Sequence, residues 1–188
     1  MSFLFGMVWT ALQWIEKIAA GINEWIGRAV SWLTLVMALV TFVIIVLRKA
    51  LSMGWIWMQD SVLYLHSVVF LIGAGFTLKR GGHVRVDVLY GRLGPKRRAL
   101  VNLFGTVFLL MPMCWLIYDR GLPYVEASWQ VRERSQEAGG LDGVYLLKTT
   151  ILVYAGLLVL QGLAVVIDSL LILSGKRQAD PEGEEAEL

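Results

Sequence analysis

Four long apolar segments without a charged residue constrain this chain more than any other feature of its sequence. They comprise residues 29–47, 61–78, 99–118 and 149–167. A helix needs about 20 mainly apolar residues to cross the hydrocarbon core of a bilayer, since each residue adds about 1.5 Å to roughly 30 Å. None of the segments alternates apolar and polar residues as a barrel strand does. The sequence therefore predicts an all-α integral membrane protein with four transmembrane helices, at about 29–47, 55–78, 99–118 and 149–170.

The first 28 residues differ from these spans because polar side chains interrupt the apolar run. On a helix, the polar residues fall on one stripe and the apolar residues on the opposite face. Trp9, Trp14 and Trp25 favour the membrane interface. We therefore predict an N-terminal amphipathic interfacial helix at 1–28, ahead of a four-helix membrane domain at 29–173. A soluble helix packed on a partner is the alternative that this pattern leaves open.

The distribution of Lys and Arg predicts the orientation of the spans. The loop at 79–98 carries seven of them, whereas the loop at 119–148 carries four together with five acidic residues. Since cytoplasmic loops are enriched in Lys and Arg, we predict that both termini, the basic loop and the acidic tail at 174–188 are cytoplasmic and that 119–148 is periplasmic. The seven basic residues of the loop are candidates to bind lipid headgroups: Lys79, Arg80, Arg85, Arg92, Lys96, Arg97 and Arg98.

Composition leaves little room for catalysis or for a soluble role. Hydrophobic residues make up 57% of the chain and charged residues 17%, against about 45–50% and 25% in soluble domains. The net charge of +2 gives no reason to expect a nucleic-acid partner. The single cysteine, Cys114, allows no internal disulfide, and only His66 among two histidines lies within a span. Because HExxH, CxxC, GxGxxG and P-loop motifs are also absent, we predict that the chain is not an enzyme and binds no metal or cofactor of its own.

Polar side chains inside the spans are the default candidates for functional sites. Tyr154, Gln161 and Asp168 recur every seven residues, so they share one helical stripe, with the small residues Ala155 and Gly162 beside it. Small and polar residues favour the docking of another helix through hydrogen bonds. An ion pathway is the alternative, although it normally needs a carboxylate deep in the membrane. Within the third span, a proline at position 112 is expected to kink or open the helix.

Two stretches resemble the small membrane subunit of tripartite ATP-independent periplasmic (TRAP) transporters, the DctQ type. The loop after the second span matches the glycine, histidine, valine and aspartate pattern of that family. The motif consists of Gly81, Gly82, His83, Val84, Val86 and Asp87. A second stretch, from residue 128 to residue 162, is similar to the external loop and last span of these subunits. Span number, chain length and inferred topology agree with the resemblance.

The resemblance implies a scaffold in the bacterial inner membrane. A small subunit of this kind binds a large DctM-type membrane subunit, which carries the substrate and sodium sites. A soluble periplasmic binding protein delivers the substrate, typically an organic acid anion, and a sodium gradient drives import. We therefore expect no substrate site in this chain, and sodium ions only in its partner.

Candidate contacts follow from the stripe, the second span and the outer loop. We predict a large-subunit interface that comprises Asp60, His66, Tyr154, Ala155, Leu158, Gln161 and Gly162. The candidate contacts with the binding protein are Glu126, Trp129, Arg132 and Glu133.

Two other functions remain open at this point. A self-sufficient homo-oligomeric transporter or channel would need a membrane-buried charge, and the first, third and fourth spans lack one. A membrane-anchor subunit of a respiratory enzyme would need haem or quinone ligands.

Overall fold

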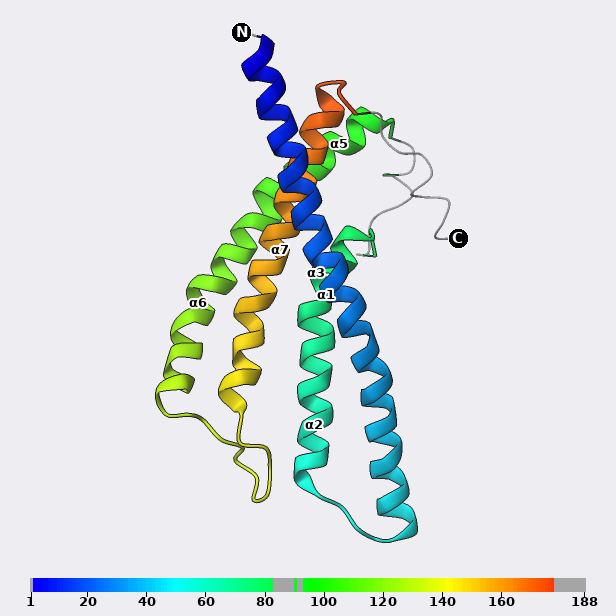
Figure 1. The fold of residues 1–188 in the computed structure, drawn as a ribbon. Helices are drawn as coiled ribbons and strands as arrows, with labels where there is room; N and C mark the ends of the chain where they lie inside the picture. Colours follow the sequence, from blue (N-terminus) through cyan, green and yellow to red (C-terminus); the bar gives the residue numbers. More distant parts are fainter. Residues whose placement is uncertain (1, 83–89, 91–92, 178–188) are drawn as a thin grey trace.

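The structure, a computed structural model, describes residues 2–82, 90 and 93–177, and every regular element in this part of the chain is a helix. Four helical stretches in this part have the length and apolar composition to cross a membrane. They are Trp9–Ala50, Ile56–Lys79, Pro95–Gln130 and Val144–Leu173. These findings confirm the predicted all-α fold with four spans. In Figure 1, the N-terminus, the start of α5 and the end of α7 lie at one end of the bundle, called the N-terminal end below.

Helix α1 (Ser2–Ala50) is continuous over 49 residues, so the structure shows no break between the predicted interfacial helix and the first span. A buried stripe of Ala19, Asn23, Gly27 and Val30 crosses the expected boundary at 28/29. A Cβ atom on Gly27 would lie 2.2 Å from Cγ of Phe76, so this glycine permits close packing. Continuity follows because neither proline nor paired glycine interrupts residues 24–34. A surface position for 1–28 stays a prediction.

The second and third spans each contain a π-helical turn. The second comprises α2 (Ile56–Ser67), η1 (Val68–Ile72) and α3 (Gly73–Lys79), and the third comprises α5 (Pro95–Gly105), η2 (Thr106–Leu110) and α6 (Met111–Gln130). Turn η2 ends two residues before Pro112. Because proline has no N–H to donate and its ring crowds the carbonyl four residues earlier, a widened turn is expected there. The predicted local opening of this helix is thus observed.

Helix α7 (Val144–Leu173) forms the centre of the bundle and contacts every other helical segment (Figure 1). In its most apolar stretch 44% of the residues are buried, against 6 to 11% in the other three spans. Helices α6 and α7 also extend beyond the predicted spans, to Gln130 and from Val144. The non-helical connection between them covers 131–143, within the predicted outer loop at 119–148.

Candidate functional site

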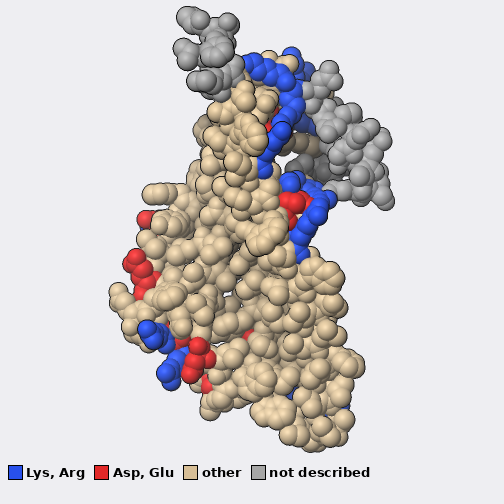
Figure 2. Space-filling model, viewed as in Figure 1, with Lys and Arg blue, Asp and Glu red and all other residues tan. Residues whose placement is uncertain are grey.

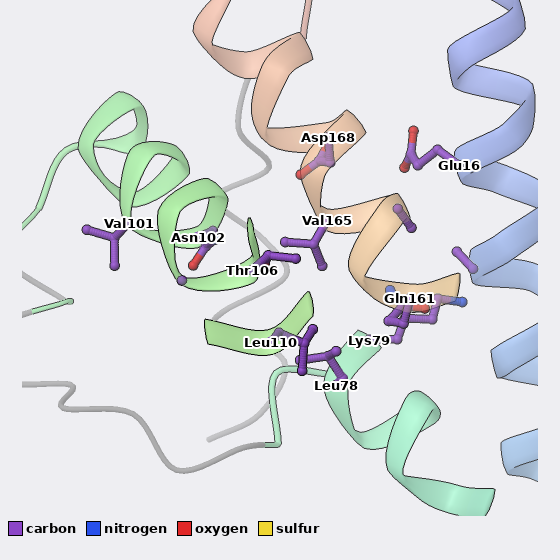
Figure 3. Close-up of a pocket in the computed structure, with 13 residues that line it drawn as sticks. Glu16, Leu78, Lys79, Val101, Asn102, Thr106, Leu110, Gln161, Val165 and Asp168 are labelled. Atoms are coloured by element: carbon purple, nitrogen blue, oxygen red, sulfur yellow. The ribbon is translucent and has the colours of Figure 1, made fainter. Parts of the chain in front are cut away.

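A polar cleft of about 430 Å³ opens between α1, α3, α5–η2 and α7 (Figure 3). The helices that form it are far apart in the sequence, and it lies toward the N-terminal end of the bundle. Six polar side chains contribute to its wall: Glu16, Lys79, Asn102, Thr106, Gln161 and Asp168. Apolar residues complete the wall, so the cleft has both polar and apolar surfaces. The sequence predicted Gln161 and Asp168 as members of one stripe, but not the residues that face them.

Gln161 is the most deeply buried polar residue of the cleft, with 4% of its surface exposed. Its Oε1 atom is buried and has no hydrogen-bond partner within the structure. The neighbouring Gly162 explains how α7 approaches η2 here, because a Cβ on this glycine would lie 2.9 Å from Met111 Cε and 3.2 Å from Thr106 Cγ2. A buried acceptor without a donor costs free energy, about 1–3 kcal/mol. Gln161 lines the cleft, so a ligand donor that reaches its buried Oε1 atom would satisfy this acceptor.

Two carboxylates and one guanidinium form a cluster at one end of the cleft. The Nη1 and Nη2 groups of Arg177 donate to the Oε1 and Oε2 atoms of Glu16 at 2.9 and 2.8 Å, and Nη1 also donates to Asp168. These bonds, those to Glu16 first, raise the pKa of Arg177 above its usual range. The cluster joins the N-terminal helix to the end of α7. Two acids and one base leave it with a net charge of −1.

A second ion cluster surrounds Glu24. Its carboxylate accepts hydrogen bonds from Arg28 Nε at 2.9 Å, Lys79 Nζ at 2.9 Å and Arg80 Nη2 at 2.7 Å. Three bases around one acid leave this cluster with a net charge of +2. The sequence offered only the i,i+4 spacing of Glu24 and Arg28 as a signal. The pairing with residues 55 and 56 positions further along depends on tertiary packing.

The seven predicted lipid-binding bases divide into three groups. Lys79 and Arg80 belong to the Glu24 cluster, and Arg98 donates to the Leu93 carbonyl at 2.9 Å. Lys96 and Arg97 are exposed at the start of α5. Arg85 and Arg92 lie outside the described residues. Most of the family loop motif, namely His83, Val84, Val86 and Asp87, also lies outside them, whereas Gly81 has the positive φ of 69° that favours glycine.

Four of the seven predicted interface residues are covered by the chain's own helices. Ala155, Leu158 and Gln161 are 2 to 4% exposed, and Gly162 is buried against η2. This part of the stripe packs mainly inside the chain, and its contact with the large subunit stays a prediction. The stripe does dock helices through small and polar residues, but the helices are its own. Tyr154 is half-buried.

Asp60, also predicted to face the large subunit, is bound by the outer connection. Its Oδ2 atom accepts hydrogen bonds from the Ser135 hydroxyl at 3.1 Å and from the Leu141 N–H at 2.9 Å. A Cβ on Gly140 would lie 2.6 Å from the same oxygen. The carboxylate thus attaches the 131–143 connection to the start of α2. In this structure the Asp60 carboxylate therefore bonds to other residues of the same chain.

His66 is exposed and borders an apolar groove between α1 and α2. The groove has a volume of about 710 Å³, and its polar members are Thr41, Gln59 and His66. The Thr41 hydroxyl donates to the Met37 carbonyl at 2.8 Å, and the His66 ring stacks on Phe70 at a centroid distance of 6.0 Å. Sequence reasoning missed Gln59, although its spacing of seven from His66 places both on one face of α2.

The four predicted binding-protein contacts lie at the end opposite the N-terminus, and two of them have partners within the chain. Glu126 and Arg132 are exposed. The Trp129 Nε1–H donates to the Thr149 hydroxyl at 2.9 Å, and Glu133 accepts a hydrogen bond from Lys148. The bond from Lys148 lowers the pKa of Glu133. On the face shown in Figure 2, Lys and Arg gather mainly near the N-terminal end, and a smaller mixed group of charges lies on the side of α6.

Comparison with known families decides the identity of the chain. Residues 37–171 match the model of the DctQ component of tripartite ATP-independent periplasmic transporters. The chain belongs to the DctQ family. The match covers most of the sequence and confirms the resemblance drawn from the glycine–histidine motif. Comparisons with curated proteins and with solved structures give no match.

Membership in the DctQ family makes this chain a component of a TRAP transporter and a multi-pass membrane protein. DctQ proteins are transporter components rather than an enzyme family. Among the residues that the structure describes, no group of three or more His, Cys, Asp or Glu residues could hold a metal ion. The tripartite family also implies partners, a large membrane subunit and a binding protein.

Proposed function

We propose that this DctQ protein is the small scaffold subunit of a sodium-driven, binding-protein-dependent transporter that imports organic acid anions. It binds and stabilises the large membrane subunit in the bacterial inner membrane and carries no substrate site of its own. Both termini lie in the cytoplasm. Sodium and substrate bind to the large subunit.

The α1–α2 groove is the observation that carries the scaffold role. His66 and Gln59 are exposed on one face of α2, within a helical stretch that can cross a membrane. Lipid tails supply no hydrogen bonds, so polar side chains within spans usually face another helix or water. An apolar groove with two such side chains along one wall is suited to a helix that carries a donor or an acceptor. We assign this groove to the large subunit.

The opposite end supports a contact with the binding protein. Glu126 and Arg132 are exposed there, and the Asp60 and Glu133 bonds hold the connecting segment in place. A fixed surface with both signs of charge suits transient recognition of a soluble protein, because complementary charge mainly speeds association. In this topology the surface faces the periplasm.

Uptake by proteoliposomes tests the proposal. Vesicles would contain this chain alone, the large membrane subunit encoded with it alone, or both, always with the cognate binding protein and a sodium gradient. We expect accumulation of an organic acid only with both subunits, and none when the sodium gradient is collapsed. Transport by this chain alone would overturn the scaffold role and support the homo-oligomeric transporter. Haem absorbance in the purified chain would support the respiratory anchor instead.

A further inference from the structure

We infer that the polar cleft between α1, α3, α5–η2 and α7 binds a single phospholipid with an ethanolamine-type headgroup, which combines a phosphate and a primary ammonium. This inference goes beyond the transport role and does not depend on it. It follows from three properties of the cleft: a buried acceptor without a donor, charges of opposite sign at its two sides, and an apolar groove that continues from it.

The buried acceptor calls for a ligand with N–H or O–H groups. Gln161 is 96% buried, lines the cleft, and leaves Oε1 without a partner. In Figure 3 this side chain lies on α7 near Lys79 of α3, with Asp168 further along α7. A primary ammonium carries three N–H donors, and one of them suffices for the amide oxygen. A choline headgroup has no N–H and would leave the acceptor unsatisfied.

The charges match a zwitterion. The Glu16–Asp168–Arg177 cluster has a net charge of −1, whereas the Glu24 cluster, to which Lys79 belongs, has a net charge of +2. An ammonium is favoured at the first cluster and a phosphate at the second. The Lys79 ammonium, the Asn102 amide and the Thr106 hydroxyl line the cleft and offer donors to phosphate oxygens. A simple anion would satisfy only one of the two sides.

The apolar groove supplies a path for the acyl chains. A second cavity of about 640 Å³ runs along the outer face of α5 and η2 and is lined only by apolar residues and glycine. It shares Val101 and Gly105 with the polar cleft. A ligand that fills both must be polar at one end and apolar at the other. Water or a lone basic side chain would leave the apolar groove empty, whereas a phospholipid occupies both the polar cleft and the groove.

Headgroup selectivity of the purified full-length chain tests the inference. The chain, extracted in a mild detergent and depleted of lipid, would be titrated with ethanolamine, choline and glycerol phospholipids of identical acyl chains, with bound lipid counted by native mass spectrometry. We expect one tightly bound lipid per chain and at least about tenfold tighter binding of the ethanolamine lipid than of the choline lipid. Equal binding of the three lipids would overturn the inference.

Two variants test the residues, each by a different physical effect. Gln161→Met keeps the length of the side chain and removes the acceptor, and Asp168→Asn removes one charge from a half-exposed side chain. We expect each to lower the preference for ethanolamine over choline by about fivefold or more. Asp119→Asn, which removes an exposed charge on α6 outside the cleft, is the matched control and should leave the preference unchanged. An unchanged preference in both test variants would contradict the assignment, and thermal unfolding shows whether each variant is folded.

Soluble phosphoethanolamine separates the lipid from its free headgroup. It carries the same phosphate and ammonium without acyl chains. We expect it to compete with the lipid only at concentrations at least about a hundredfold higher, because the apolar groove adds to lipid binding. Phosphoethanolamine that binds as tightly as the lipid, or that binds when the lipid shows no binding, would overturn the inference. The groove would then have no part in recognition, and the cleft would be a site for a small zwitterion.

Discussion

Helix α7 and the second half of α1 are both long apolar spans, but they differ in what covers them. Ten residues of α7 are buried within the chain, whereas none of residues 31–50 of α1 is buried. Yet α1 contains the more apolar stretch of the two. The comparison shows that a helix in a membrane protein is apolar whether lipid or protein covers it. Its hydropathy therefore does not predict which helix forms the core. The core is marked by small and polar residues that allow close approach, such as Ala155, Gly162 and Ser169 on α7.

The largest expected effect comes from enlarging Gly27, where the first half of α1 meets α3. The variant Gly27→Leu forces its side chain into the space of Phe76, whose ring lies 2.2 Å from the position of a Cβ. We expect a loss of stability of about 3 kcal/mol, at the upper end for overpacking, and a low yield of folded protein. Thermal unfolding in detergent measures the loss. Gly21→Leu on the same helix is the control, because nothing lies within 4 Å of its Cβ position.

The groove on the exposed half of α1 should respond differently, in binding rather than in stability. The double variant Gln59→Leu/His66→Leu removes both polar side chains from α2 and keeps the apolar surface. Interhelical hydrogen bonds in membranes contribute about 0.6 kcal/mol each on average, so we expect up to about tenfold weaker association with the large subunit. Co-purification at graded expression levels measures it. Phe108→Leu, on the exposed face of η2, should leave association unchanged; equal losses in both variants would mean that the groove is not the interface.

Glu24 tests how firmly the well-packed half of α1 is attached to α3. Replacing it with Gln removes the carboxylate that accepts bonds from Arg28, Lys79 and Arg80. Because the three partners are partly exposed to solvent, we expect a loss of only about 1 kcal/mol, smaller at high salt. Thermal unfolding at 0.05 and about 0.5 M salt checks both parts of the prediction. A loss that does not change with salt would point to packing rather than charge.

The smallest effect is expected at the outer connection, where Glu133 is paired with Lys148. The hydrogen bond from Lys148 lowers the pKa of Glu133 below its ordinary value of 4.5. A lowered carboxyl pKa stabilises the folded state above the ordinary value, and the stabilisation is lost as pH falls through the lowered one. The wild type should therefore unfold at a higher temperature than Glu133→Gln at neutral pH, and the two should converge as pH falls through the lowered pKa of Glu133. A difference that persists in acid would show that the pair contributes through packing and not through charge.

The sequence by itself determined the class of the protein, the number of its spans and its family. Backbone groups in hydrocarbon must bond within their own segment, so a charge-free run of about 20 apolar residues is enough to predict a helix. The glycine–histidine motif, together with the stretch from residue 128 to residue 162, pointed to the DctQ family from the residues alone. The effect of Pro112 on its helix was predictable for the same reason, since a missing N–H acts within one turn.

Tertiary structure decided which residues are covered and which face outward. The stripe on α7 was visible in the sequence, but the burial of Gln161 in the chain's own cleft depends on η2 approaching Gly162. The close packing of α1 on α3 at Gly27 and the binding of Asp60 by the outer connection likewise rest on contacts with Phe76, Ser135 and Leu141. Such contacts join residues that are distant in sequence, and their geometry depends on the shapes of both helix surfaces. Helical periodicity places a residue on a face, and only the packing of the other helices decides what that face contacts.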